Sequence, residues 1–388
     1  MSTPAPAGPR PAIPVARHGG RIARAQAGVR ARGLDALLVG VGPDLVYLAG
    51  YAAMTLERLT MLVVPAEGPV TLVAPRLEAA PARACPAVAT GSAAVATWEE
   101  TDDPVALVRH LVPEPAGRLA VSDRLWALHV LRLQAALPAA VFEPASLVLR
   151  DLRVVKDPDE VALLRLAAHA ADRVIHEVAH GRLIGRTEAD VAREVRDRLV
   201  AEGHDSAEFA IVASGPNSAS PHHAASDRVI RAGEPIVLDI GGPLGGYGSD
   251  ITRTVWVTGG DATCGPDDEY LRLYSVLRAA QAEATHAVRP GVPCERIDLV
   301  ARELIGAAGH GAHFIHRTGH GIGLEGHEDP YLVAGNGEAL EPGMAFSVEP
   351  GIYLEGRYGA RIEDIVVCGE DGPIVLNEAP RDLLVVTG

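Results

Sequence analysis

A carboxylate stands inside an apolar strand, where a buried charge is costly. In the segment PIVLDIGG (235–242), Asp239 interrupts a run of apolar residues that is typical of a buried strand. An isolated carboxylate in such a place must be protonated or paired with a cation. Asp250 follows after a glycine-rich turn, and two strands joined by such a turn lie side by side. Both acids are therefore expected to point into one pocket; the alternative is that Asp239 ends its strand and caps the turn.

The same pattern occurs twice more, near the end of the chain. Glu349 ends the apolar run of AFSVEPGIY, and Glu363 in GARIEDIVVCG precedes a strongly β-forming run. Four carboxylates in one site of low dielectric would repel one another, and two divalent cations would balance their four negative charges. Oxygen ligands with one imidazole suit Mn, Co, Fe or Zn, and the excess of oxygen favours Mn(II) or Co(II). We therefore predict a dinuclear metal site.

A glycine-rich segment offers the imidazole. HRTGHGIGLEGHE (316–328) holds His316, His320 and His327, and its glycines let the backbone pass close to a metal or a substrate. A single buried histidine is more often a hydrogen-bonded structural residue than a ligand. Three histidines in one such segment favour a role in chemistry.

A second histidine-containing segment precedes the strand of Asp239. The polar loop SGPNSASPHHAASD (214–227) contains His222 and His223. A functional role is one interpretation of this pair. A solvated loop with two exposed histidines is the other, and loop composition alone does not choose between them.

The bulk composition argues against several classes of protein. A chain of 388 residues with 48% apolar residues is long enough for two domains and a large core. Its formal net charge of −15 would repel nucleic acids and anionic membranes, so neither is expected as a partner. No apolar window approaches the ~18 residues of a membrane span, and the four cysteines form no CxxC pair. A cytoplasmic protein is expected.

The first part of the chain has the pattern of a compact α/β domain. Residues 1–15 are rich in proline and alanine and are expected to form a loose arm. A helical pattern begins at Ile22. A buried strand is expected at 35–40, and two strands joined by a turn are expected within 61–75. We therefore predict an N-terminal domain over residues 16–151.

A helix-start signal marks the second domain. Asp157 and Pro158 precede a long helical run, and a second helix follows it. Strand-like segments and two more helical segments come next, and strand-like segments then return. This grouping predicts an α+β domain with an antiparallel sheet over residues 152–388.

Five segments together resemble the pita-bread metallopeptidases, namely prolidase (Xaa-Pro dipeptidase) and aminopeptidase P. They occur in the family's order and spread over most of 153–388. The first domain resembles the creatinase/prolidase N-terminal domain, with a weaker match at PDLVYLAGY (43–51). The resemblance implies an α+β pita-bread (creatinase/aminopeptidase) catalytic domain preceded by a smaller α/β domain. The matching segments are ASGPNSASPHHAASD, VLDIGGPLGGYGSDITRT, HRTGHGIGLEGHE, EPGMAFSVEPGIY and RIEDIVV.

Carried over residue by residue, the resemblance implies how two divalent metal ions are held. Asp239 binds one metal, and Asp250 and Glu363 bridge the two. His320 and Glu349 bind the other metal. Mn(II) is the first expectation, with Co(II), Zn(II) and Fe(II) as alternatives. Creatinase shares the fold but lacks these ligands, so the complete set disfavours a metal-free reaction.

The resemblance also implies residues that contact the substrate. His222 and His327 resemble the family's two substrate-contacting histidines, and Arg361 resembles an arginine that braces the site or the substrate. His316 resembles a histidine of the pocket. Tyr331 stands where several prolidases have an arginine, the residue best suited to grip the free carboxylate of a dipeptide. This departure favours an aminopeptidase P-like or mixed Xaa-Pro peptidase over a strict dipeptidase.

The implied reaction removes the N-terminal residue from Xaa-Pro peptides, so small peptides with proline at the second position are the expected partners. A hydroxide between the two metals attacks the scissile carbonyl, His222 or His327 stabilises the oxyanion, and Glu349 moves a proton. A homodimer is expected, since family members are usually dimers. The alternatives are a non-peptidase hydrolase or lyase on the same fold and a catalytically silent binding module.

Overall fold

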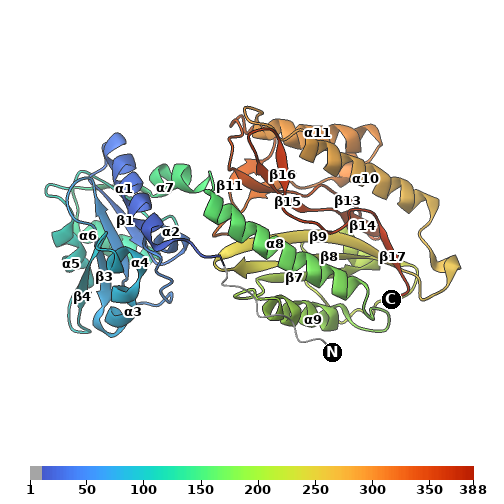
Figure 1. Cartoon of the computed structure of the whole chain (residues 1–388), viewed down its shortest axis with the longest axis horizontal. Coiled ribbons are helices and arrows are strands. Elements are labelled where there is room, and N and C mark those ends of the chain that lie inside the picture. The colour runs from blue at the N-terminus through green and yellow to red at the C-terminus, as the bar shows by residue number, and fades with distance from the viewer. Residues whose placement is uncertain (1–10) are drawn as a thin grey trace. The chain divides into compact units, whose positions relative to one another are not determined.

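The chain folds as two units, each with its own sheet and core. The computed structural model describes residues 11–388, in which one unit is Ile13–Arg153 and the other includes Val154–Gly388. Figure 1 shows the first unit in blue to blue-green and the second in green to red. Our predicted boundary, between residues 151 and 152, falls inside the last helix of the first unit, α7 (Ser146–Arg153).

The N-terminal unit is built on one mixed sheet of six strands, in the order β4-β3-β2-β1-β5-β6. Strand β2 is antiparallel to β1 and β3, and the other pairs are parallel. Strands were expected at 35–40 and within 61–75, and the structure has them there. The elements are α1 (Val15–Ala31), β1 (Ala36–Gly40), α2 (Pro43–Ala49), β2 (Met61–Pro65), β3 (Thr71–Pro75), α3 (Ala79–Ala84), α4 (Pro86–Ala89), β4 (Ala94–Trp98), α5 (Pro104–Leu111), β5 (Arg118–Val121), α6 (Ala127–Ala136), β6 (Val141–Pro144) and α7.

The first helix begins earlier than its pattern suggests. The expected arm, residues 1–15, lies largely outside the described residues, and α1 starts at Val15 instead of Ile22. Gly19 and Gly20 weaken the helical signal because glycine has low helix propensity. His18 and Arg21, on either side of them, are buried and contact the carbonyl oxygen of Tyr47 at 3.2 and 3.3 Å. Tertiary contacts therefore support a helix that local propensity does not reveal.

The first half of the C-terminal unit pairs two helices with a sheet. Helix α8 begins at the predicted signal with a capping box, in which Asp157 accepts from the backbone of Glu160 and Glu160 accepts from the backbone of Asp157. The sheet has the order β17-β9-β8-β7, with β17 parallel to β9 and the other pairs antiparallel. The elements are α8 (Pro158–Ala179), α9 (Glu188–Ala201), β7 (Phe209–Ser214), β8 (Glu234–Leu244), β9 (Tyr247–Val257) and β17 (Leu384–Val386).

The second half repeats the scheme with shorter strands. Helices α10 (Asp268–His286) and α11 (Cys294–Ala307) precede an antiparallel sheet in the order β11-β10-β12-β15-β16 and a separate hairpin, β13-β14. We expected an antiparallel sheet, whereas the unit has two larger sheets, one of them with a parallel edge strand. Runs of three to five strand residues do not reveal which sheet they join. The strands are β10 (Gly319–Gly321), β11 (Glu328–Leu332), β12 (Ala345–Val348), β13 (Gly351–Leu354), β14 (Tyr358–Arg361), β15 (Asp364–Cys368) and β16 (Pro373–Val375).

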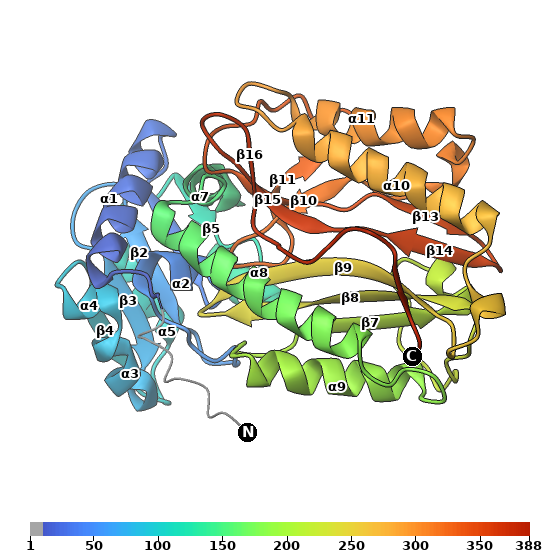
Figure 2. The same cartoon turned by 45° about the vertical axis from the view of Figure 1, so that its right-hand side comes forward.

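Helices cover the outer face of each sheet system, and two apolar cores result. One core joins α8 and α9 to β7, β8 and β9, and the other joins α10 and α11 to the strands of the second half. Figure 2 shows the two helix pairs on opposite sides of the strands. An isolated backbone bridge pairs Thr252 of β9 with Glu363, the residue before β15, and so connects the two larger sheets. In residues 11–388, no helix has the length and apolar character needed to cross a bilayer.

Candidate metal centre

Asp239 and Asp250 lie on one face of the β8–β9 ribbon. In the antiparallel register, Asp239 pairs with Thr252 and Gly241 pairs with Asp250. Residues two apart in a strand share a face, so the two acids are diagonal neighbours. Asp239 is 7% exposed and Asp250 is 4% exposed. Asp239 lies well inside β8 and away from the turn, so it does not have the capping role that was the alternative.

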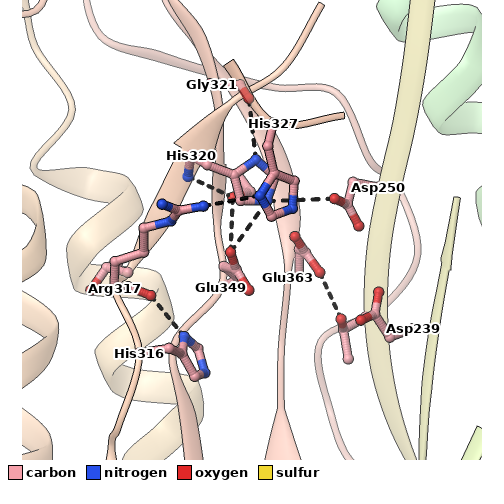
Figure 3. A network of polar contacts seen from close by, with 12 residues as sticks. Asp239, Asp250, His316, Arg317, His320, Gly321, His327, Glu349 and Glu363 are labelled. Atoms are coloured by element: carbon pink, nitrogen blue, oxygen red, sulfur yellow. Dashed lines mark hydrogen bonds and ion pairs between the residues drawn. The ribbon is translucent and has the colours of Figure 1, made fainter. Parts of the chain in front are cut away.

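The second half brings the other predicted ligands to this face. His320 is the middle residue of β10, Glu349 directly follows β12, and Glu363 directly precedes β15. The bridge between Thr252 and Glu363 holds the two sheets together at this point. Figure 3 shows the carboxylates and His320 gathered around one space.

The donor atoms lie close enough to share cations. Glu363 belongs to two groups of three residues in which one donor atom from each lies within 4.8 Å of the others, and Asp250 and His320 are each shared by two groups as well. A third such group includes His327, whose ring stacks on that of His320 with centroids 3.7 Å apart. The groups are His320, Glu349 and Glu363; Asp239, Asp250 and Glu363; and Asp250, His320 and His327.

The carboxylates strongly perturb one another. Burial and then the charges of Glu363, Asp239 and Glu349 raise the pKa of Asp250 well above its ordinary value. Burial and the charges of Glu349 and Asp239 do the same to the pKa of Glu363. Burial raises the pKa of Glu349 to about 7, although Arg361 opposes the shift. Divalent cations would compensate this cluster of negative charge.

His320 is prepared for metal binding. Its Nδ1 lies 3.2 Å from the carbonyl oxygen of Gly321, which can only accept, so the proton belongs on Nδ1. The Nε2 lone pair then faces Glu349 at 3.4 Å and Asp250 at 3.6 Å. Burial and then the neighbouring His327 lower the pKa of His320 to about 3, so the ring is neutral, as a metal ligand must be.

Asp239 offers a second free acceptor. Among the described residues, its buried Oδ1 has no hydrogen-bond partner, whereas Oδ2 accepts from Arg361 at 2.5 Å. Arg361 also donates to the hydroxyl of Tyr353 at 2.8 Å and to Thr252 at 3.0 Å, and Thr252 donates to Glu363 at 2.6 Å. Neighbouring side chains thus orient these predicted ligands while leaving one oxygen of Asp239 unpaired among the described residues. This chemistry fits a resident cation.

A cavity of about 560 Å³ opens onto the carboxylates. His222 and His327 lie at its exposed side, and Phe209 and Ile211 of β7 give it an apolar wall. His316 is deeper, where burial and then Arg361 lower its pKa to about 4. The cavity is lined by nine of the ten predicted site residues: His222, Asp239, Asp250, His316, His320, His327, Glu349, Arg361 and Glu363.

Tyr331 is the predicted site residue that does not line the cavity, and Arg317 is a lining residue that we did not predict. Tyr331 pairs with His320 across β10 and β11, and the guanidinium of Arg317 lies over its ring, 4.4 Å from the centroid. Arg317 donates to Nδ1 of His327 at 2.9 Å. A cation three residues before the expected ligand in HRTGHG was the available signal.

The comparisons with known proteins identify the family. Residues 162–370, more than half of the chain, match metallopeptidase family M24. The chain belongs to this family. Residues 21–155 match the creatinase/prolidase N-terminal domain.

The similar proteins extend over nearly the whole chain. A probable dipeptidase PepE of Mycobacterium tuberculosis is 48% identical over 367 residues, which are 94% of this chain and 96% of the relative. The crystal structure of dipeptidase PepE from Mycobacterium ulcerans is 46% identical with a TM-score of 0.90, covering 97% of this chain and 99% of that one. A prolidase structure from Thermococcus sibiricus is 36% identical with a TM-score of 0.86, covering 94% and 98%.

These findings confirm the resemblance, the fold class and the assignment as a metallopeptidase. The M24 peptidase has a creatinase-type N-terminal domain and a pita-bread catalytic domain. Its family uses two metal ions, and the donor groups above are the candidates for holding them. A silent binding module and a non-peptidase reaction are not favoured by such relatives.

Proposed function

We propose that this metallopeptidase removes the first residue from Xaa-Pro dipeptides. The observation behind the proposal is Arg317, a cation at the cavity beside a centre of four carboxylates. The names dipeptidase and prolidase among the relatives support the same substrate class. A dipeptide has a free carboxylate next to its proline, and an arginine is the side chain best suited to bind it.

Arg317 suits this role better than Arg361. Arg361 is 2% exposed and already donates to Asp239, Tyr353 and Thr252, so its guanidinium braces the ligands. Among the described residues, Arg317 forms no ion pair with an acid and rests on the ring of Tyr331. Tyr331 would therefore hold the guanidinium of Arg317 in place through the contact with its ring. This arrangement shifts our expectation from a mixed Xaa-Pro peptidase toward a dipeptidase.

The metal ligands would be the five that the sequence analysis named. Asp239 would bind one ion, His320 and Glu349 the other, and Asp250 and Glu363 both. When bound, the two ions would polarise the scissile carbonyl and lower the pKa of a water between them. Four carboxylates against one imidazole favour Mn(II), with Co(II), Zn(II) and Fe(II) as alternatives.

The remaining groups would bind the substrate and move protons. Because Arg317 donates to Nδ1 of His327, the proton of this ring belongs on Nε2, which can donate to the developing oxyanion. His222 at the exposed side is the second donor of this kind. Glu349 would accept the proton of the attacking water and return it to the leaving proline nitrogen. His316 would line the pocket beside them.

Reconstitution tests the proposal. The metal-free protein is loaded with Mn(II), Co(II) or Zn(II) and assayed on Xaa-Pro and Xaa-Pro-Yaa peptides. We expect release of the first residue, with Xaa-Pro dipeptides preferred and two ions per chain by metal analysis. No release from any Xaa-Pro peptide under any metal would refute the proposal.

The role of Arg317 has a test of its own. Arg317→Leu should lower kcat/KM for an Xaa-Pro dipeptide by about 10- to 100-fold, because a charge-assisted hydrogen bond contributes about 1.5–3 kcal/mol. Hydrolysis of the corresponding Xaa-Pro amide, which lacks the carboxylate, should change little. Arg357→Leu is the control, since Arg357 pairs with Glu269 in an exposed ion pair and does not line the cavity. Equal losses on dipeptide and amide would rule out carboxylate binding by Arg317.

Three features of the whole chain are also proposals. We propose that residues 16–151 act as an accessory domain and residues 152–388 as the catalytic domain. We propose a homodimer, which sedimentation analysis tests. We propose a cytoplasmic location, supported by the free cysteines at 85, 264, 294 and 368.

A further inference from the structure

Glu188 is a buried carboxylate outside the metal centre. It is the first residue of α9, it is 0% exposed, and burial alone would raise its pKa. Hydrogen bonds from Ser226, Ser214 and His223 outweigh burial and lower the pKa to about 2. Its donors are the backbone N–H and hydroxyl of Ser214, the amide of Asn217, Nε2–H of His223, and the backbone N–H and hydroxyl of Ser226, at 2.6–3.1 Å.

All these donors belong to the loop that presents His222 to the cavity. Ser214 ends β7, Asn217 lies in the following short helix, and Ser226 closes the loop. His222 lies between two fixed neighbours. The carbonyl oxygen of Pro221 accepts from Arg361 at 3.3 Å, and Nε2 of His223 donates to Glu188 at 2.8 Å. One end of this short segment is thus tied to the metal centre and the other to Glu188.

We propose that Glu188 is a positioning residue for His222, acting through His223 and the backbone of the loop. The inference rests on the proposed function, because it takes His222 as the donor that contacts the substrate. Glu188 itself does not line the cavity. A carboxylate is suited to the task because it offers only acceptors, and six donor groups from one loop converge on it. The exposed His222 is not among the hydrogen-bond donors of Glu188, so the position of its side chain depends on the positions of the residues next to it.

The test is Glu188→Gln in the metal-loaded protein. The amide keeps the size of the side chain but turns one acceptor into a donor that faces the N–H of Ser214 or Ser226. We expect kcat/KM for the Xaa-Pro dipeptide to fall about 10- to 100-fold, with two ions still bound. The amide hydrogen of Ser226 should exchange with solvent at least about tenfold faster, relative to amides in the middle of α9. The second readout does not depend on catalysis.

A double-mutant cycle separates positioning from general stabilisation. In a His222→Ala background, Glu188→Gln should change kcat/KM by less than about threefold, because the group that Glu188 positions is already gone. If the fold-reduction of kcat/KM in the double variant instead equals the product of those in the two single variants, Glu188 does not act through His222. If wild-type protein cleaves no Xaa-Pro peptide, the proposed function fails. If it does and Glu188→Gln retains full kcat/KM, the positioning role alone fails.

Two further variants complete the design. Asp172→Asn is the matched control, because Asp172 is also a buried carboxylate that accepts from Asn377 and Glu378, away from the cavity. It should lower stability and leave kcat/KM unchanged. If Glu188→Gln does not fold, His223→Leu replaces it in the cycle, because this change removes one donor to Glu188. Its effect on kcat/KM should likewise be small in the His222→Ala background. His223→Gln, whose amide can still donate, should restore most of the activity; no rescue would contradict the proposal.

Discussion

The C-terminal unit contains two clusters of buried carboxylates, and the pKa values in the two clusters are shifted in opposite directions. Glu188 is surrounded by N–H and O–H donors of one loop, which lower its pKa to about 2. Asp250, Glu349 and Glu363 face one another, and their pKa values are raised. In the first cluster, hydrogen-bond donors of the protein stabilise the negative charge of Glu188. In the second, the protein assembles charge that only protons or cations can neutralise.

The predicted metal-ligand carboxylates and the structural carboxylate Glu188 differ in the hydrogen-bonding groups around them. Both kinds are buried, so burial alone does not separate them. The deciding feature is the balance of donors and acceptors around the oxygens. Glu188 accepts from six groups, whereas Asp239 keeps a buried oxygen without a partner among the described residues. A surplus of acceptors therefore distinguishes the candidate metal site.

The largest effect should come from Asp250→Asn, which attacks the acceptor surplus itself. We expect loss of at least one of the two ions and a fall in kcat/KM on the order of 10³-fold, since a bound ion supplies several kcal/mol. The metal-free variant should unfold at a higher temperature than metal-free wild type, because one repelling charge is removed. Metal analysis and thermal unfolding measure both. Glu188→Gln should behave the opposite way, keeping both ions and losing stability; if the two variants behave alike, the comparison is wrong.

A medium effect is expected from pH on the metal-free protein. The pKa of Glu349 is raised from 4.5 to about 7, so the folded state binds the proton more tightly than the unfolded state. Its unfavourable contribution is present above pH 7 and disappears as pH falls toward 4.5, so the unfolding temperature should rise on going from pH 8 to pH 5. Glu349→Gln should reduce that rise, and metal-loaded protein should not show it. A wild-type apoprotein that becomes less stable over this range would contradict the assigned repulsion.

The Glu188 cluster should show the reverse trend at lower pH. Its pKa is lowered from 4.5 to about 2, so its stabilising contribution is complete above pH 4.5 and is lost as pH falls toward 2. The difference in unfolding free energy between wild type and Glu188→Gln should therefore shrink over that window. Chemical denaturation at several pH values measures it. A constant difference would mean that the charge of Glu188 is not what the loop requires.

Asp239 and Asp250 could be predicted from the sequence because a tight turn makes neighbours of two strands and the period of two then sets the face. Glu188 could not, since an acid just after Thr187 resembles any residue in the first turn of a helix. Its hydrogen-bond donors come from a loop that lies 26 to 38 residues further along the chain. Arg317 was missed for a similar reason, because its position over the ring of Tyr331 depends on the pairing of two short strands.

The fold shows the same limit. Helix α8 was predicted at the correct place because its capping box is local, with Asp157 and Glu160 three residues apart. The division of the strands into two sheets was not, because it depends on pairings between segments more than a hundred residues apart, such as Thr252 with Glu363. Local rules give the elements, and the sum of weak long-range contacts selects their partners.

The smallest effect tests whether the Glu188 cluster is redundant. Ser226→Ala removes the hydroxyl that donates to Glu188 at 2.6 Å but leaves the backbone N–H of Ser226 and the other donors in place. We expect a loss of about 1 kcal/mol in unfolding free energy and a fall of less than about threefold in kcat/KM, with two ions still bound. Removal of one proposed metal ligand should have a larger effect, because each candidate group offers only three donor residues. A loss of activity as large as that of Glu188→Gln would mean that this one hydroxyl, and not the shared set of donors, holds the loop of His222 in place.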